Sequence, residues 1–260
     1  MLNKQEIDTI LNIAKSSGDL ILEYYKGYKE LSTTIKQDNS VVTKADLVAN
    51  DLINSKLLKF FPEISIVSEE NNQASNIKAV QNNKYFIIDP LDGTSSFIKK
   101  SDEFTVNIAL IENQSPIFGV IFLPAKDVMY YTDEKGKSHK IEHYSKNNES
   151  QYINTTNKET DFIVICTKRE PEKSDIISDL KNKNVKIKEL ISISSSYKFC
   201  LIAEGKADLY PRKVNIKAWD IAAGHSIVKG AGGTVIDSTT QKELQYNITN
   251  SFDVPTFEVS

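Results

Sequence analysis

The sequence predicts an α/β protein with two halves: an α+β N-terminal half, residues 1–155, that contains an antiparallel sheet, and an α/β C-terminal half, residues 156–260. In the first half, closely spaced apolar runs are joined by short polar links, which is typical of hairpins. In the second half, strand-like and helix-like segments alternate, which favours partly parallel strands. The polar stretch 133–161 contains few apolar residues and marks the boundary between the two patterns.

Composition excludes several classes of protein. The chain has 260 residues, 40% of them hydrophobic, and a net charge of −3, so it carries no basic field of the kind that binds nucleic acid. Its first residues lack the apolar core of a signal peptide, and no apolar run is long enough to span a bilayer. Cys166 and Cys200 lie in apolar surroundings that favour buried, reduced thiols. We therefore expect a cytoplasmic protein with no transmembrane segment.

The histidines give no sign of a metal site. Without cysteines at ligand spacing, the three histidines cannot form the usual zinc site. His139 and His143 lie in a polar segment, and we expect both to be solvated.

Two amphipathic helices are expected near the N-terminus. Apolar residues recur at helical spacing over residues 4–25, and Gly27 provides a C-terminal stop. Thr43 can cap a second helix, whose apolar side continues to Leu57. Asp46 lies in the first turn of that helix, where the helix dipole alone favours an acid. Asp46 therefore gives no functional signal by itself.

The stretch around Asp89 holds the main candidate site. Residues 85–88 are apolar and rich in β-branched and aromatic side chains, which predicts a buried strand. We expect the strand to end at Asp89 and Pro90, because proline has no N–H to give to a β-ladder. Asp92 follows three residues after Asp89. Two carboxylates this close repel each other unless a cation lies between them, and oxygen ligands suit Mg2+.

The residues after Asp92 could hold an anion. Gly93 lets the backbone turn tightly or approach a ligand, and free N–H groups around Gly93 and Thr94 can bind a phosphate. A plain surface turn is the alternative, because Asp, Pro and Gly are common in turns. A second predicted strand, residues 64–67, leads into Glu69, which could complete a three-carboxylate metal site with Asp89 and Asp92.

The remaining elements complete the two halves. The first half continues with a hairpin of strands at 104–111 and 117–122 and a third strand at 128–131. In the second half we expect strands at 162–166, 185–190 and 207–210 and helices at 171–180, 195–203 and 218–228. Asp220 lies in the first turn of the last helix, where an acid is again explained by the helix dipole.

Taken together, four segments of the chain resemble the inositol monophosphatase superfamily of metal-dependent phosphatases. They are VVTKAD, VSEE, DPLDGTSSF and AWDIAAGH, and their order and separation agree along essentially the whole chain. Within the superfamily, the stretches DEFTVNIALI, ISSSYKFCLIAEGKADLYPR and WDIAAGHSIVKGAGGTV resemble the 3'(2'),5'-bisphosphate nucleotidase branch, the CysQ type.

This resemblance implies a fold and an activity. The fold is a layered α/β/α/β/α sandwich of the inositol monophosphatase type. The activity is hydrolysis of the 3'-phosphate of 3'-phosphoadenosine 5'-phosphate to give AMP and phosphate, with two or three Mg2+ ions. The partner is thus a small phosphorylated nucleotide. Peripheral association with the cytoplasmic side of the inner membrane also belongs to this branch, although no segment here predicts it.

The resemblance also implies roles for the residues that match the family motifs. The matching metal ligands are Glu69, Asp89, Asp92, Asp220 and the backbone carbonyl of Leu91. The group that orients and deprotonates the attacking water matches Asp46, Glu69 and Thr94. Substrate contacts match Glu69, Leu91, Asp92, Gly93, Thr94 and Asp220. Candidates for the second phosphate of the substrate are Ser195, Lys198 and Arg212, and ordinary surface cations are the alternative for the last two.

Some positions depart from the branch. Ser95 and Ser96 replace the usual lysine and glutamate, Ser194 replaces a glycine, and Val41 replaces a proline. The first two departures touch the substrate side, so an inositol or sugar monophosphate phosphatase with the same metal site is the alternative function. A non-catalytic nucleotide-binding protein is a further alternative, but binding alone would not need the water-activating group.

Overall fold

The computed structural model describes residues 2–35, 41–146, 149–168, 172–214 and 216–260. Its helices are α1 (Lys4–Tyr25), α2 (Lys44–Phe60), α3 (Gln73–Ala79), α4 (Thr94–Ile98), α5 (Glu172–Asn182), α6 (Tyr197–Ala203) and α7 (Ala218–Gly230), with a 3-10 turn η1 (Pro124–Lys126). Its strands are β1 (Thr33–Ile35), β2 (Val41–Thr43), β3 (Ser65–Ser68), β4 (Lys84–Asp92), β5 (Thr105–Glu112), β6 (Ser115–Leu123), β7 (Val128–Thr132), β8 (Ser138–Glu142), β9 (Ser150–Tyr152), β10 (Phe162–Cys166), β11 (Ile187–Ser192), β12 (Tyr210–Arg212), β13 (Ile216–Lys217), β14 (Val235–Asp237), β15 (Asp253–Val254) and β16 (Phe257–Val259).

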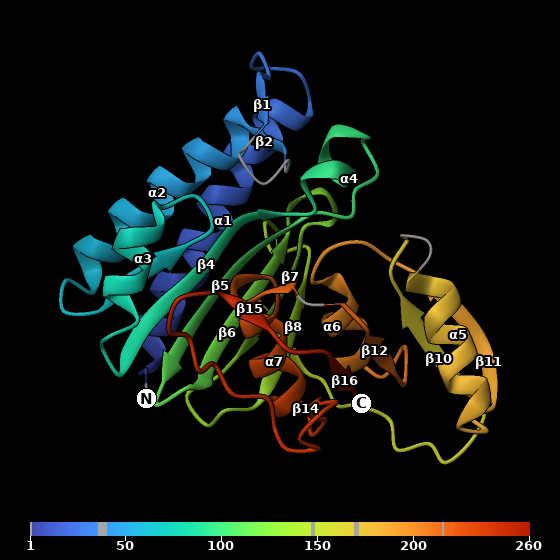
Figure 1. Ribbon diagram of the computed structural model, residues 1–260. Coiled ribbons are helices and arrows are strands. Elements are labelled where there is room, and N and C mark those ends of the chain that lie inside the picture. The colour runs from blue at the N-terminus through green and yellow to red at the C-terminus, as the bar shows by residue number, and fades with distance from the viewer. Residues whose placement is uncertain (1, 36–40, 147–148, 169–171, 215) are drawn as a thin grey trace.

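One large sheet organises the molecule (Figure 1). Its strand order is β3-β4-β5-β6-β7-β8-β9, with β3 parallel to β4 and every later pair antiparallel. The predicted hairpin forms β5 and β6, and its turn lies at Asn113 and Gln114, which both have positive φ as the mirror-image hairpin turns require. The antiparallel sheet predicted for the first half is thus confirmed.

The polar stretch 133–161 contributes β8 and β9 to this sheet, which the sequence analysis did not predict. His139 on β8 is buried, not solvated as expected. Its ring stacks on Tyr131, and its Nε2 lies 3.0 Å from an Asp133 carboxylate oxygen. His143 is exposed as expected.

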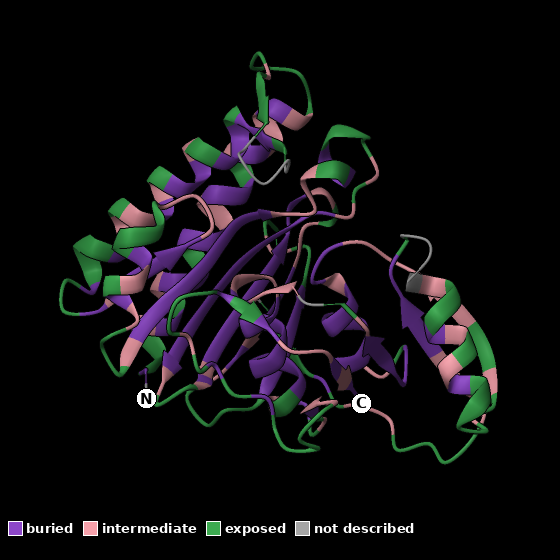
Figure 2. Cartoon of the chain, viewed as in Figure 1, coloured by how far each residue is buried: buried purple, intermediate pink, exposed green. Residues whose placement is uncertain are grey.

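Helices cover both faces of the sheet, so its central strands are buried on both sides (Figures 1 and 2). Side chains alternate along β4. Phe86 and Ile88 pack into a core with α1 and α2, whereas Tyr85 and Ile87 pack into a second core with α6 and α7. This layering confirms the predicted α/β sandwich. The second core joins residues from both sides of the predicted boundary, and the division at residue 155 stays a prediction.

Smaller sheets complete the C-terminal half. β10 and β11 pair in parallel and pack against α5 through Ile176 and Leu180. The strands β12, β16 and β14 form an antiparallel sheet, of which the sequence analysis foresaw only the first, about three residues too early. Residue 171, where the helix seen as α5 was expected to begin, lies outside the described residues.

No helix among the described residues is long and apolar enough to cross a bilayer. The peripheral membrane association implied by the resemblance stays a prediction. Cys166 and Cys200 are both buried and free, as expected.

Candidate active site

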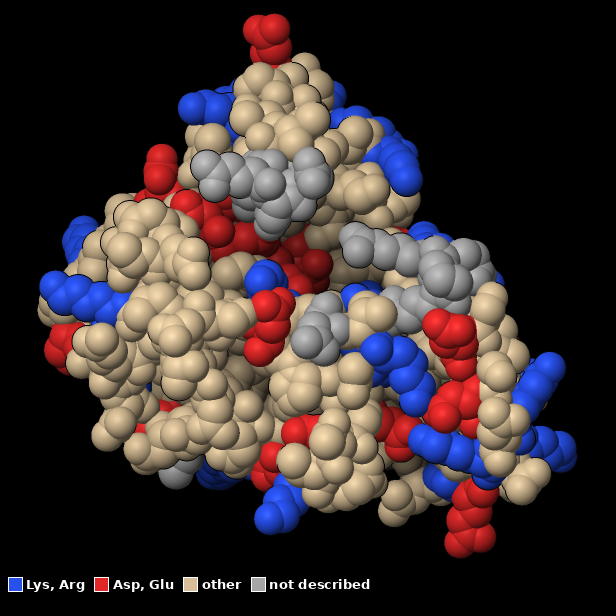
Figure 3. All heavy atoms as spheres, in the orientation of Figure 1, with Lys and Arg blue, Asp and Glu red and all other residues tan. Residues whose placement is uncertain are grey.

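A cavity of about 720 Å3 opens at the end of β4. All the site residues named from the sequence line it except Asp46, which lies directly behind Thr94. Acidic side chains gather in a hollow on the same side of the molecule (Figure 3). The fold therefore brings residues from both halves of the chain to one place.

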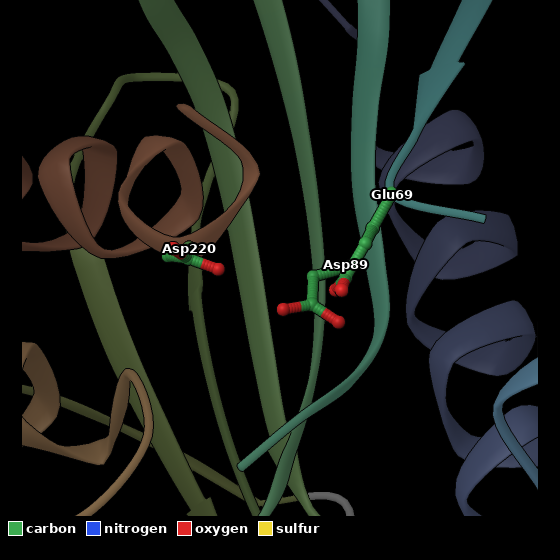
Figure 4. Close-up of side chains that lie close together, drawn as sticks. All are labelled: Glu69, Asp89 and Asp220. Carbon is green, nitrogen blue, oxygen red and sulfur yellow. The ribbon is translucent and has the colours of Figure 1, made fainter. Parts of the chain in front are cut away.

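Three carboxylates converge in this cavity (Figure 4). Glu69 follows β3, Asp89 belongs to β4, and Asp220 lies in the first turn of α7. One oxygen from each lies within 4.8 Å of the others. Oxygen ligands at this separation suit a hard divalent cation. The sequence analysis predicts a trio of Glu69, Asp89 and Asp92. In the structure Asp220 takes that place, and Asp92 lies close enough that its charge raises the pKa of both Asp89 and Asp220.

Asp220 reaches the trio because α7 lies directly on the sheet. Gly119 of β6 makes this approach possible, since a Cβ there would lie 2.4 Å from the carbonyl oxygen of Ala223 in α7. The side chain of Asp220 also accepts a hydrogen bond from the backbone N–H of Lys217, at 3.0 Å. The helix-start role expected for this acid is therefore present, and its carboxylate still faces the other two.

The path of β4 corrects one prediction. The strand does not end at Asp89 and Pro90 but continues to Asp92. Asp89 pairs with Asn107 and Asp92 with Thr105, so three steps along β4 match two along β5. This is a β-bulge, and it interrupts the ladder where Pro90 has no N–H to offer.

The bulge also decides where Asp92 points. Along an uninterrupted strand, Asp92 would share the face of Phe86 and Ile88, which is covered by α1 and α2. The extra residue returns Asp92 to the face of Asp89, which is the face covered by α6 and α7. Both aspartates therefore reach the same cavity.

Asp46 makes hydrogen bonds both at the start of α2 and toward Thr94 at the cavity, and its catalytic role stays a prediction. Its Oδ2 accepts the backbone N–H of Thr43 at 2.9 Å and closes the capping box of α2. Its Oδ1 accepts the Thr94 hydroxyl at 3.1 Å. Asp46 is only 3% exposed, and burial raises the pKa of its carboxyl, with bonds from Thr43 and Thr94 acting in the opposite direction. Helix capping thus accounts for one carboxylate oxygen only.

Burial and mutual repulsion dominate the electrostatics of the site. Burial raises the pKa of Asp89 well above its usual range, and the charges of Glu69 and Asp92 raise it further. The pKa of Asp220 is also raised well above its usual range, by burial and then by Asp92 and Glu69. A bound cation would relieve this repulsion. The donor set therefore fits a divalent metal.

This electrostatic arrangement predicts a pH dependence for the metal-free protein. A raised carboxyl pKa means that the folded state binds protons more tightly than the unfolded state, so stability is lost as pH rises from the usual carboxyl range through the raised pKa. We expect the Tm of the wild type in EDTA to fall behind that of Asp89→Asn by a few degrees between about pH 5 and pH 8, since about 1 kcal/mol shifts the Tm by roughly 2–4 °C at this size. Thermal melts at several pH values measure this difference, and parallel curves would contradict it.

Gly93 holds the turn that follows Asp92. Its φ is +87°, and a Cβ there would lie 2.8 Å from the carbonyl oxygen of Glu103 and 3.2 Å from the Cβ of Ser195. Only glycine adopts this conformation cheaply and leaves room for both neighbours. The turn predicted around Gly93 and Thr94 is thus present, and it opens the short helix α4.

We therefore expect Gly93→Ala to lower activity by on the order of 100-fold and stability by about 1–3 kcal/mol. Gly27→Ala is the matched control, because Gly27 has a φ of +78° but a methyl group there would meet no atom within 4 Å. Enzyme assays and thermal melts of both variants separate crowding in the site from backbone strain. Equal effects of the two substitutions would contradict the close approach.

The cations expected beside the second phosphate are buried in the cavity wall. Lys198 and Arg212 are 9% and 7% exposed, so they are not ordinary surface cations. The Lys198 ammonium donates to the carbonyl oxygen of Ser195 at 2.6 Å, and Arg212 Nε donates to Val214 at 3.2 Å. Both positive charges also lie near the acids. Burial raises the pKa of Asp92 and of Asp220, and the charges of Lys198 and Arg212, respectively, act in the opposite direction. Their contact with a substrate stays a prediction.

Two residues that hydrogen-bond directly to Asp92 were missed. Ser196 donates its backbone N–H to Asp92 Oδ2 at 2.5 Å, and Asn107 Nδ2 lies 3.4 Å from the same oxygen. The available signal was Asn107, an amide in the middle of an otherwise apolar strand, since buried polar groups need partners. Ser196 carried no comparable signal.

The sequence profile of the inositol monophosphatase family matches residues 3–258. The chain belongs to the inositol monophosphatase family. This confirms the resemblance inferred from the motifs. The family is metal-dependent, and the cluster Glu69, Asp89 and Asp220 can hold a metal ion.

The family members that are similar to this chain include several proteins with the same name. Two curated relatives are called 3'(2'),5'-bisphosphate nucleotidase CysQ. The protein from Buchnera aphidicola is 39% identical over 252 residues, which cover 95% of this chain and 89% of the relative. The protein from Salmonella typhimurium is 38% identical over 255 residues, covering 98% and 99%. The crystal structure of CysQ from Bacteroides thetaiotaomicron is similar with a TM-score of 0.77 and 32% identity, over 97% of this chain and 95% of that one.

Proposed function

We propose that this chain is a Mg2+-dependent 3'(2'),5'-bisphosphate nucleotidase that hydrolyses the 3'-phosphate of 3'-phosphoadenosine 5'-phosphate to give AMP and phosphate. The observation that carries the proposal is the convergence of Glu69, Asp89 and Asp220 in a cavity whose wall also holds buried cations. The bisphosphate nucleotidase name of relatives that match almost the whole chain supports this choice of substrate.

The proposed metal ligands are the carboxylates of Glu69, Asp89, Asp92 and Asp220 and the carbonyl of Leu91. An all-oxygen set of this kind favours Mg2+, and two or three ions would neutralise the clustered charge. When bound, Mg2+ would lower the pKa of the attacking water and stabilise charge on the transferred phosphoryl group.

The protein's own groups orient the reactants. The Thr94 hydroxyl is the donor toward both Asp46 Oδ1 and the carbonyl oxygen of Leu91, so its lone pairs can accept a hydrogen from the attacking water. The proposed acceptor of the water's proton is Glu69, together with Asp46, which lies behind Thr94. Backbone N–H groups of the turn at Gly93 would contact the phosphate that leaves the substrate. Phosphoryl transfer depends mainly on such positioning and on charge neutralisation, so no protein nucleophile is needed.

Ser195, Lys198 and Arg212 are the proposed contacts of the 5'-phosphate. If Arg212 binds that group, Arg212→Gln should lower kcat/KM for the bisphosphate by about 10–100-fold, because a charged hydrogen-bonded pair contributes roughly 1.5–3 kcal/mol. Activity on 3'-AMP, which lacks this phosphate, should change little. Lys213→Gln is the control, because Lys213 pairs with Asp179 at 2.6 Å. Equal losses on both substrates would contradict the assignment.

Phosphate release from a panel of substrates tests the proposed function. The panel contains 3'-phosphoadenosine 5'-phosphate, 3'-AMP and inositol 1-phosphate, each with Mg2+ and with EDTA. We expect a strong, Mg2+-dependent preference for the bisphosphate. Equal or better hydrolysis of inositol 1-phosphate would instead indicate a monophosphatase. Binding of the nucleotide without hydrolysis of any substrate would indicate a non-catalytic protein.

A further inference from the structure

Three buried polar side chains lie next to Asp92 and are linked to it by hydrogen bonds. Thr105 and Asn107 belong to β5, and Ser196 immediately precedes α6. They are 0%, 1% and 2% exposed, respectively. Polar groups buried this deeply are costly unless they are hydrogen-bonded. The hydrogen-bond partners of these three side chains therefore indicate their role.

The hydrogen bonds of these side chains run in one direction. Ser196 Oγ donates to Asn107 Oδ1 at 2.7 Å, which uses its single hydrogen. Thr105 Oγ1, 2.8 Å from Ser196 Oγ, must therefore be the donor of that pair. Asn107 Nδ2 and the backbone N–H of Ser196 both point at Asp92 Oδ2, at 3.4 Å and 2.5 Å. Thr105, Ser196 and Asn107 thus form a chain that ends on one oxygen of Asp92.

The Ser196 side chain does not serve to cap α6. A serine before a helix ordinarily accepts a hydrogen bond from a backbone N–H of the first turn. The Ser196 side chain makes no such capping bond to α6. Its hydroxyl instead contacts β5 in the other half of the chain.

The residues just before Ser196 are also hydrogen-bonded to the N-terminal half of the chain. Glu103, which lies just before β5, accepts the backbone N–H of Ser194 at 2.9 Å and pairs with Lys168 at 2.7 Å. Residues 194–196 are therefore attached to the N-terminal half at both ends. This attachment places the Ser196 N–H next to Asp92.

We propose that Thr105, Asn107 and Ser196 are positioning residues that fix the orientation of the Asp92 carboxylate for metal binding. The proposal rests on the proposed function, in which Asp92 is a metal ligand. The hydrogen bonds from Asn107 Nδ2 and from the backbone N–H of Ser196 both reach Oδ2. Holding Oδ2 in this way would leave Oδ1 for the metal. Groups that orient a metal ligand in this way typically change metal affinity or activity by about 10–100-fold when they are removed.

The test measures Mg2+ binding by isothermal titration calorimetry, alongside hydrolysis of the bisphosphate, in Ser196→Ala and Thr105→Val. We expect each substitution to raise the Mg2+ dissociation constant by about 10–100-fold. Thr105→Ser keeps the donor hydroxyl and should restore affinity to near the wild-type value. If Ser196→Ala fails to fold, the nearly isosteric Thr105→Val and its serine counterpart carry the test.

Thr132→Val is the matched control. Thr132 is 1% exposed, and its hydroxyl accepts the N–H of Gly119 at 3.1 Å and lies 3.4 Å from Ser226 Oγ in α7. It is a buried strand threonine between the sheet and a helix, without contact to Asp92. The control should lower the Tm without changing Mg2+ affinity.

Two outcomes would overturn the proposal. If the wild type binds Mg2+ and hydrolyses the bisphosphate, and both variants bind Mg2+ as tightly as the wild type, the positioning role is wrong and the proposed function stands. If the wild type binds no Mg2+, the metal role of Asp92 fails, and the positioning role fails with it.

Discussion

Asp89→Asn is expected to lower kcat for bisphosphate hydrolysis by on the order of 1,000-fold or more, and to abolish the rise in Tm that Mg2+ causes in the wild type. Asp89 lies between Glu69 and Asp220 (Figure 4) and is 1% exposed. An asparagine would fill the same space but remove one of the three charges that meet there. Loss of several kcal/mol of metal-based stabilisation corresponds to this factor, because each 1.36 kcal/mol is tenfold in rate.

The two readouts need a control for loss of charge alone. Asp51→Asn removes an exposed acid from α2 and should change neither kcat nor the Mg2+-dependent Tm. Thermal melts are recorded with Mg2+ and with EDTA, and kcat is measured at saturating Mg2+. An Asp89→Asn protein that kept its rate, or that Mg2+ still stabilised as in the wild type, would contradict the assignment of Asp89 as a metal ligand.

Thr94→Val is expected to lower kcat by about 100–10,000-fold, which is the usual range for a lost proton-transfer group. The Thr94 hydroxyl is 3.1 Å from Asp46 Oδ1 and 3.2 Å from the carbonyl oxygen of Leu91, so it links the buried acid to the cavity. Valine keeps the shape of the side chain and removes this link. Because Thr94 is not among the proposed metal ligands, Mg2+ affinity should stay close to that of the wild type.

Thr94→Ser separates the hydroxyl from the methyl group. Serine retains the hydroxyl and should restore most of the rate, whereas full activity in the valine protein would exclude a role for Thr94 in water activation. Steady-state kinetics over a range of Mg2+ concentrations distinguish a lower kcat from weaker metal binding.

Much of the fold could be predicted because the deciding patterns are local. The amphipathic spacing of residues 4–25 and the cap at Thr43 predicted α1 and α2 with nearly the observed bounds. The end of β4 could not be predicted this way. Pro90 normally ends a ladder, and only the pairing of Asp89 and Asp92 with β5 reveals that a bulge accommodates it.

The site was predictable residue by residue but not in its arrangement. Motifs pointed to Asp89, Asp92 and Asp220 as acids of one site. Which of these carboxylates lie closest together depends on the docking of α7 and on the bulge, and neither leaves a local pattern in the sequence. The same holds for Ser196, whose partners on β5 are about 90 positions away in the chain.

The bulge in β4 limits how this chain can change over evolution. Inserting one residue between Thr105 and Asn107 of β5 would allow three steps along β4 to match three along β5, so the strands would pair without the bulge and the sheet itself would lose little. Asp92, however, would then turn to the opposite face from Asp89, among the apolar side chains that α1 and α2 cover. The relative lengths of β4 and β5 at this point therefore decide whether Asp92 reaches the site, and a homologue with one residue more in β5 here would keep the architecture without the acid.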